Sequence, residues 1–325
     1  MKEITYKEAL REALSEEMTR DENVILMGED IGLYGGNFQV TQDLVLQFGE
    51  ERVMDTPLSE AVIAGCATGA AMSGLRPVVE VMFSDFVTLM MDNLVNQAAK
   101  QSFMSAGKVS VPLVVRLPVG CGTGAAAQHS QSLEAWMCHV PGLKVVFPSN
   151  PYEAKGLMKA AIRDNNPIIF CEHKMLYNAV GNVPEDDYVI QIGQANVMKK
   201  GAHLSIITYG YSVQKCLQAA MQLKTRGIDA EIIDLRTLLP LDEKTIIDSV
   251  KKTGRALIVH DAVRTGGVGG EIAALIAEKA FPYLKAPVVR LAGKDVPIPF
   301  NKKLEQAAVP QVADIKKAAE RLMRK

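Results

Sequence analysis

Short runs of β-branched and apolar residues alternate with helix-periodic segments along the chain, and this alternation restricts the fold more than any other feature. Strand candidates lie at 23–28, 76–83, 111–118, 143–149, 166–173, 204–210, 229–236, 256–262 and 286–293. Helix candidates lie at 5–19, 60–72, 86–101, 131–139, 151–163, 211–226, 242–252, 270–280 and 312–325. Such alternation is typical of a parallel sheet with helices on both faces. We therefore expect an α/β protein.

The stretch at 177–203 interrupts this alternation, because it carries glycine, proline and acidic residues without a helical period. We interpret it as the connection between two domains, with a short hairpin inside it. The expected division is a doubly wound α/β domain at 1–185, a linker at 186–200 and a second doubly wound α/β domain at 201–325.

Composition and charge exclude several classes of protein. The 325 residues are 48% hydrophobic and 22% charged, and the formal net charge is −1. Lysine and arginine are spread evenly, which argues against nucleic acid and against an anionic membrane surface as partners. The sequence has no secretory signal pattern, and no apolar run approaches the ~20 residues that span a bilayer. We expect a cytoplasmic protein.

Five cysteines are too few and too widely spaced for a disulfide framework or a zinc site. Their number is odd and no two of them form a C-x-x-C pair. We expect all of them to be small buried hydrophobic residues. They are Cys66, Cys121, Cys138, Cys171 and Cys216.

The glycine-rich segment at 265–280 follows a strand candidate and opens a helix candidate. A helix N-terminus after such a loop can bind an anion. However, the spacing is not G-x-G-x-x-G, and no acidic residue follows at the position of a ribose-binding carboxylate. The alternative is a tight turn of an α/β domain. The sequence also lacks a Walker lysine motif and a G-x-S-x-G elbow.

Glu60 is the one carboxylate at the start of a helix that otherwise carries mostly small apolar residues. Gly65 and Gly69 stand four residues apart on this helix, among several alanines. A helix of this composition has low intrinsic propensity and needs close tertiary support, so we expect a helix pair at a subunit interface. The simplest interpretation of Glu60 is a favourable charge in the first helical turn, with Ser59 as N-cap.

The loop at 120–131 is crowded with glycine and alanine and ends at His129 and Ser130. Small residues allow a loop to lie against a ligand or another backbone. His129 would lie at the junction of this loop and the next helix. It is either a catalytic residue or a structural one.

Six longer segments occur in an order that resembles a known family. They are "GED" at 28–30, "DTPLSE" at 55–60, "QHSQSLEAW" at 128–136, "PGLKVVFPSNPYEAKGL" at 141–157, "AIRDNNP" at 161–167 and "DVPIPF" at 295–300. Together they resemble the beta subunit of the thiamine diphosphate-dependent first component of 2-oxo acid dehydrogenase complexes. The pyruvate and acetoin dehydrogenase members are the most similar, and the likeness covers essentially the whole chain.

The resemblance implies a pyrimidine-binding domain, a transketolase-like C-terminal domain and a heterotetramer of two alpha and two beta chains. The alpha chain of the family holds the diphosphate and magnesium through a G-D-G motif, which this sequence lacks. The resemblance implies that Glu60 matches a glutamate that bonds a ring nitrogen of the aminopyrimidine and so promotes loss of the thiazolium proton. Glu29, Leu58 and Phe86 match the pyrimidine pocket. His129 matches a histidine that assists acyl transfer to the lipoyl arm of the acyltransferase core.

The resemblance also implies a potassium site near "AIRDNNP". Its ligands would be oxygens of Leu113, Ala161, Ile162, Asp164 and Asn166. Oxygen ligands of this kind suit a hard, weakly charged cation. The alternative is an ordinary helix C-terminus at the same place.

Substrate and class remain open at this stage. The "DVPIPF" segment is closer to the pyruvate and acetoin members than to the branched-chain 2-oxo acid members, which stay an alternative. A non-catalytic scaffold that docks the complex is a second alternative. A nicotinamide oxidoreductase is a third, although no dinucleotide fingerprint supports it.

Overall fold

A computed structural model describes residues 1–324 of the chain, which form two compact units. The first unit comprises Met1–Val119 and Trp136–Ile192, and the second comprises Gly120–Ala135 and the chain from Gly193 onward. The 120–135 segment thus belongs to the second unit, although it is flanked on both sides by the first. Each unit is described by itself.

The first unit contains most of the elements in the N-terminal half of the chain. Its strands are β1 (Lys2–Thr5), β2 (Val24–Gly28), β3 (Val53–Asp55), β4 (Arg76–Glu80), β5 (Val114–Val119), β6 (Lys144–Val146), β7 (Ile168–His173) and β8 (Val180–Val183). Its helices are α1 (Tyr6–Arg20), α2 (Leu44–Phe48), α3 (Glu60–Met72), η1 (Ser84–Met90), η2 (Asn93–Ala98), α4 (Ala99–Met104), α6 (Pro151–Arg163) and η3 (Lys174–Leu176). The short helix α5 (Glu134–Cys138) begins in the 120–135 segment.

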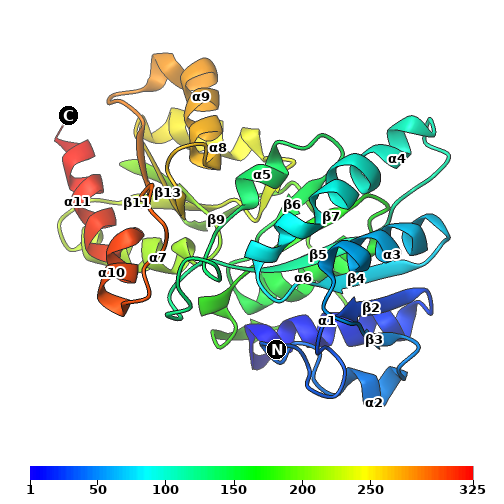
Figure 1. Cartoon of the computed structure of the whole chain (residues 1–325). Coiled ribbons are helices and arrows are strands. Elements are labelled where there is room, and N and C mark those ends of the chain that lie inside the picture. The colour runs from blue at the N-terminus through cyan, green and yellow to red at the C-terminus, as the bar shows by residue number, and fades with distance from the viewer. Residues whose placement is uncertain (325) are drawn as a thin grey trace. The chain divides into compact units, whose positions relative to one another are not determined.

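The main sheet of the first unit is parallel, with strands in the order β6-β7-β5-β4-β2-β3. Every residue of β2, β5 and β7 is buried, as expected for strands that are covered on both faces. Figure 1 shows α3 and α4 on one side of this sheet and α1 and α6 on the other. A separate antiparallel pair joins β1 to β8.

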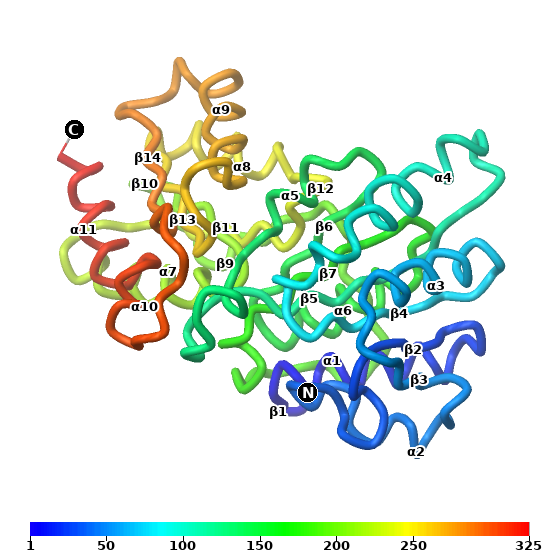
Figure 2. The backbone as a smooth tube through the Cα atoms, in the orientation of Figure 1, coloured from blue at the N-terminus to red at the C-terminus, as the bar shows by residue number. Residues whose placement is uncertain are grey.

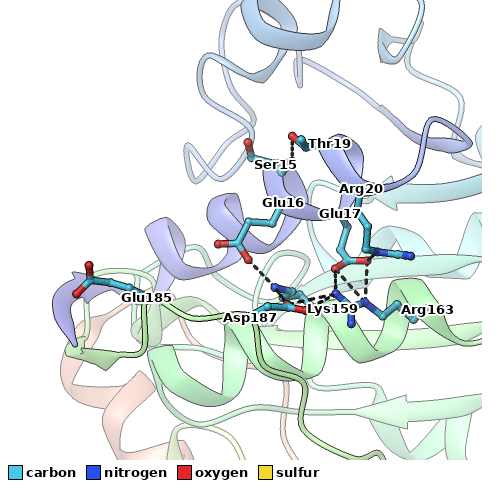
Figure 3. Close-up of a pocket in the computed structure, with 9 residues that line it drawn as sticks. All are labelled: Ser15, Glu16, Glu17, Thr19, Arg20, Lys159, Arg163, Glu185 and Asp187. Atoms are coloured by element: carbon cyan, nitrogen blue, oxygen red, sulfur yellow. Dashed lines mark hydrogen bonds and ion pairs between the residues drawn. The ribbon is translucent and has the colours of Figure 1, made fainter.

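Ion pairs join α1 to α6. Lys155 and Lys159 of α6 are almost fully buried, and each ammonium group lies 2.5 Å from a carboxylate oxygen of Glu16 on α1. One turn further along α6, Arg163 pairs with the buried Glu17 at 2.6 Å. Figure 3 shows Glu16, Glu17, Lys159 and Arg163 around a pocket that Asp187 also lines. The lysine stems are buried while their charges are paired, so this cluster fixes the two helices together.

A second charged cluster lies inside the sheet itself. Arg116 on β5 is 1% exposed and donates to Glu172 of β7 from Nε and Nη2, both at 2.8 Å. It also pairs with Glu80 of the neighbouring strand β4. The hydroxyl of Tyr177 donates to the same Glu172 carboxylate at 2.7 Å. One guanidinium therefore holds two buried carboxylates on the two strands that flank it.

The second unit contains a five-stranded sheet in the order β14-β13-β10-β11-β9, in which only β9 is antiparallel to its neighbour; β12 lies outside this sheet. Its strands are β9 (Asn196–Lys199), β10 (Leu204–Thr208), β11 (Ala230–Asp234), β12 (Thr237–Leu239), β13 (Ala256–Val263) and β14 (Val289–Gly293). Its helices are α7 (Ser212–Lys224), α8 (Glu243–Thr253), α9 (Val268–Ala280), η4 (Phe281–Tyr283), α10 (Lys302–Ala308) and α11 (Val312–Met323). Apolar residues of α7 and α11 and of the central strands form one core.

The predicted α/β architecture is confirmed, and several predicted elements differ in detail. The helix expected at 86–101 is broken into a 3-10 helix, a π-helix and α4. The hairpin expected within 177–203 is wrong, because β8 pairs with β1 and β9 pairs with β11. Strand β1 and helices α2 and α10 had no counterpart among the predicted elements.

The cysteines and the glycine-rich segment also allow a direct comparison. All five cysteines are free thiols, but Cys66 is exposed and Cys138 is only half-buried, so the expectation that all are buried is wrong for these two residues. Near α9, a Cβ added at Gly269 would lie 2.5 Å from Nε2 of the buried His260. Glycine is required there for close packing, which favours the tight turn over an anion site. None of the helices within residues 1–324 has the length and apolar character that crossing a membrane requires.

Candidate active site

Three loops of the first unit follow the carboxyl ends of the adjacent strands β3, β2 and β4. The chain runs from β2 to β3 on one side and then returns to β4 on the other side. This reversal is a topological switch point, the place where open α/β sheets bind their ligands. Glu29 follows β2 directly, Glu60 opens the helix after β3, and Phe86 lies in η1 after β4.

The two carboxylates at this edge are both buried and close enough to interact. Glu29 is 5% exposed and Glu60 is 7% exposed. Burial, and next the negative charge of Glu60, raise the pKa of Glu29 above its usual value. The Glu29 carboxylate accepts a hydrogen bond from the backbone N–H of Ser59 at 3.1 Å. Ser59 stands at the N-cap position of α3, but its side chain makes no capping bond.

Apolar residues lie on segments that adjoin Glu60, because Leu58 precedes it by two residues and η1, which carries Phe86, contacts α3. Leu58 is 77% exposed, and Phe86 is half-buried with its ring edge-on to Phe83 at 6.2 Å between centroids. The Nδ2 group of Asn93 on η2 donates to the carbonyl oxygen of Ala61 at 2.9 Å and holds the first turn of α3. The site thus combines buried acid groups with an apolar wall, which suits a flat heterocycle that carries basic nitrogen atoms.

His129 belongs to the second unit, within the 120–131 loop. Four residues of this loop have positive φ angles, namely Gly120, Gly122, Gly124 and Ala126. The backbone N–H of His129 donates to the carbonyl oxygen of Ala126 at 3.4 Å, and its side chain is half-buried. Left-handed backbone of this kind favours glycine and sets the path of the loop before the histidine.

Glu134 follows His129 and is the first residue of α5. It is 2% exposed, and burial raises the pKa of its carboxyl group to about 7. One carboxylate oxygen accepts a hydrogen bond from the hydroxyl of Tyr209 at 2.9 Å. The Tyr209 ring stacks on His260 with 5.8 Å between centroids. The start of α5 is therefore attached to the β10 and β13 region of the second unit.

The residues expected to bind potassium lie together around the turn between α6 and β7. The carbonyl oxygen of Leu113 accepts from the N–H of Ile168 at 2.8 Å, and that of Ala161 accepts from the N–H of Asp164 at 3.3 Å. Arg76 donates to the carbonyl oxygen of Ile162 at 2.9 Å. Each carbonyl keeps a second lone pair for a cation.

The Asp164 carboxylate at this turn already has several partners. Lys144 lies 2.5 Å from one oxygen, and the backbone and side-chain N–H groups of Asn166 donate to the other. Burial opposes ionisation, but these donors outweigh it and hold the pKa of Asp164 below its usual value. The residues expected to bind potassium thus supply the oxygen atoms that this cation prefers. Two positively charged side chains, Arg76 and Lys144, lie at the same turn.

Four residues that shape these regions were missed at the sequence level, namely Asn93, Glu134, Tyr209 and Glu305. Their partners are distant in the chain, as in the 183-residue separation between Gly122 and Glu305. No short motif contains both members of such a pair. No local pattern marked them, because Glu305 lies in a helix rich in polar residues and Tyr209 lies at the end of a strand candidate.

Comparison with known proteins gives both units a relative. Residues 2–180 match the family described as "Transketolase, pyrimidine binding domain", and residues 193–315 match "Transketolase, C-terminal domain". A solved structure titled "Split gene transketolase, inactive beta4 tetramer" shares the fold with a TM-score of 0.81 at 21% identity, covering 99% of this chain and 98% of that one.

Individual relatives define the family more narrowly than the two domain matches do. The "Pyruvate dehydrogenase E1 component subunit beta" of Rhizobium meliloti is 47% identical over 97% of this chain and 69% of its own length. The "Acetoin:2,6-dichlorophenolindophenol oxidoreductase subunit beta" of Cupriavidus necator is 46% identical over 99% and 98%. The "2-oxoisovalerate dehydrogenase subunit beta" of Bacillus subtilis is 47% identical over 94% of each chain.

The two matched domains define a thiamine diphosphate-dependent enzyme component of the transketolase type. The chain belongs to the family of E1 component beta subunits of pyruvate and acetoin dehydrogenases, which are oxidoreductase components. The expected fold class and family are confirmed.

Proposed function

We propose that the chain supplies the pyrimidine half of a split thiamine diphosphate site in a pyruvate or acetoin dehydrogenase. The observation that carries the proposal is the pair of buried carboxylates, Glu29 and Glu60, at the switch point of a pyrimidine-binding domain. Family relationship alone would not assign a reaction. The buried acid groups supply the chemistry at a ligand-binding edge.

Each residue has a defined task in this proposal. Glu60 shares a proton with a ring nitrogen of the aminopyrimidine, Glu29 holds the loop before α3, and Leu58 and Phe86 pack on the ring. When bound, thiamine diphosphate supplies the carbanion chemistry that cleaves the bond next to the substrate carbonyl. His129 assists transfer of the acetyl unit to a lipoyl group.

The proposed partners are an alpha subunit and a lipoyl-bearing acyltransferase core, in a heterotetramer of two alpha and two beta chains. One stripe of α3 is exposed and uncharged; it comprises Ala61, Val62, Cys66, Gly69 and Met72. A Cβ added at Gly69 would meet no atom within 4 Å. Such a stripe allows the close approach of a helix from the alpha subunit. The alpha subunit would also hold the diphosphate and magnesium.

We expect the chain to be inactive alone and active when it is co-expressed with its alpha subunit. The assay is reductive acetylation of a separate lipoyl domain with thiamine diphosphate, magnesium and either pyruvate or acetoin. The chain alone should show no tight magnesium-dependent cofactor binding by calorimetry, because its sequence lacks the diphosphate motif.

Other outcomes of the calorimetry and of the acetylation assay would support different conclusions. Submicromolar cofactor binding by the chain alone would contradict the split site. Turnover of branched-chain 2-oxo acids only would select the branched-chain alternative. An assembled complex that binds the acyltransferase core but is inactive with every substrate would select the non-catalytic scaffold.

We also propose that potassium binds at the turn formed by residues 161–168 and Leu113. Replacing potassium chloride by tetramethylammonium chloride at equal ionic strength should lower the melting temperature of the assembled enzyme by about 3 °C. A ligand at roughly ten times its Kd stabilises by about 1.4 kcal/mol, which corresponds to a shift of that size. Equal melting temperatures and activities in the two salts would remove the site.

A further inference from the structure

The 120–131 loop is held at its centre by one carboxylate from the C-terminal part of the second unit. Oε1 of Glu305 accepts hydrogen bonds from the backbone N–H groups of Gly122 at 2.7 Å and of Gly124 at 3.2 Å. Oε2 accepts from Gly124 as well, at 3.2 Å. Figure 2 shows the loop beside α10, which carries Glu305. Both glycines have positive φ angles, so their N–H groups turn towards the same acceptor.

Glu305 is well placed to fix the loop because its own position is fixed. Its side chain is 1% exposed. At the start of α10, Oδ1 of Asn301 accepts from the N–H groups of Lys303 and Leu304 at 3.0 and 3.3 Å. At the end of α10, the carbonyl oxygen of Ala308 accepts from the N–H of Lys294 at 2.8 Å. Both ends of this short helix are therefore anchored.

The loop has two further anchors. Along the chain, His129 lies between the glycines that Glu305 holds and the anchored residues Gln131 and Glu134. At its base, the N–H of Gly120 donates to the carbonyl oxygen of Gln131 at 3.1 Å. Beyond it, Glu134 is bonded to Tyr209. Of these three anchors, only Glu305 uses a carboxylate to accept hydrogen bonds from two backbone N–H groups. Hydrogen bonds to a charged acceptor are stronger than those between neutral groups.

We propose that Glu305 is a positioning residue for His129, holding the loop in the conformation that presents the histidine for acyl transfer. This inference rests on the proposed function of His129. A carboxylate is required because it only accepts hydrogen bonds. The amide oxygen of a glutamine could replace Oε1, but it would carry no full charge, and its NH₂ group would stand in place of Oε2 and face the N–H of Gly124.

The test compares Glu305→Gln with Glu278→Gln, an exposed glutamate of α9, in the enzyme assembled with its alpha subunit. Hydrogen exchange of the 120–127 amides should become roughly tenfold faster or more in Glu305→Gln, because two charge-assisted bonds are weakened. Acetylation of a lipoyl domain should fall about tenfold. Turnover with ferricyanide, an acceptor that bypasses the lipoyl group, should stay within about twofold of the parent.

Two further variants separate positioning from general stability. Glu305→Asp keeps an acceptor-only group and should recover part of the lipoyl transfer. His129→Ala should lower acetylation of the lipoyl domain, and adding Glu305→Gln to it should cause little further loss in that assay, because both changes act on one group.

The inference and the proposed function fail in different ways. Unchanged exchange of the loop amides, or an equal loss in both assays, would overturn the positioning role while the parent remains active. If Glu305→Gln did not assemble, Glu305→Asp would decide by the same two assays. A parent enzyme that turns over none of the substrates would overturn the proposed function, and with it the catalytic reason for this contact.

Discussion

Replacing Glu60 by glutamine should leave the assembled enzyme folded and remove most of its activity. Glutamine has nearly the same volume, and it occupies a first-turn position of α3 that tolerates a neutral polar group. It cannot share a proton with a pyrimidine nitrogen, so the function of the buried carboxylate is lost. Loss of one general acid–base group typically costs ~10²–10⁴-fold in rate. Turnover and exchange of the thiazolium proton, followed by nuclear magnetic resonance, measure the effect.

The alternative role of Glu60 as a favourable charge at a helix N-terminus predicts a different outcome. Only about 0.3–1 kcal/mol of stability would be lost, and turnover would hardly change. Glu50→Gln, at an exposed position of the same unit, controls for a change of charge. Thiazolium exchange at the parent rate in Glu60→Gln would reduce Glu60 to a helix-terminal charge.

The same variant has a readout that does not depend on activity. The negative charge of Glu60 contributes to the raised pKa of Glu29. Removing that charge should lower the pKa of the Glu29 carboxyl group, and carboxyl carbon resonances of the two proteins would show it. This shift tests whether the two groups interact in solution.

Local patterns in the sequence were sufficient to predict those helices and strands that are marked by nearby residues, such as a capping residue or a β-branched run. Helices α3 and α6 have the ranges that were predicted, and α6 begins with a capping Asn150 followed by Pro151, a pair with a known preference for helix starts. Most strands of both sheets also lie where the β-branched runs predicted them, to within a few residues, but β3 and β9 had no predicted counterpart.

Tertiary contacts explain what the sequence did not predict. The break in the helix expected at 86–101 occurs where Asn93 reaches across to the backbone of α3. Strand β1 pairs with β8, about 180 residues away, so neither strand has a local partner. Glu60 stood out by its residue type alone, but its role came from the family resemblance. The anchors of the His129 loop depend on pairs that only the fold brings together.

The cluster around Arg116 shows most clearly that tertiary contacts cannot be predicted from local patterns. In the sequence, its two glutamates look like ordinary polar residues of strands. Glu80 and Glu172 lie 36 and 56 residues from Arg116 in the chain, and all three are buried. Burial raises the pKa of Glu80, although the guanidinium opposes this effect. The stability of the first unit therefore depends on the one cation between these two acids.

Arg116→Met should destabilise the first unit by about 3–5 kcal/mol at pH 7–8, since removal of one partner leaves buried charges uncompensated. The pKa of Glu80, which burial already raises, would rise further once the opposing guanidinium is removed. A buried carboxyl group with a raised pKa destabilises the folded state when it ionises, which happens as the pH rises through that pKa. In its protonated form, at lower pH, it has no such effect. The deficit should therefore shrink towards pH 4.5.

Urea unfolding followed by tryptophan fluorescence measures this deficit, because Trp136, the single tryptophan, belongs to the first unit. Arg264→Met, at an exposed position, is the matched control and should change stability by less than about 0.5 kcal/mol. Adding Glu80→Gln and Glu172→Gln to Arg116→Met should remove the pH dependence, because no buried carboxylate then remains in the cluster. A deficit below about 1 kcal/mol for Arg116→Met, or one that is independent of pH, would show that the guanidinium does not compensate the two carboxylates.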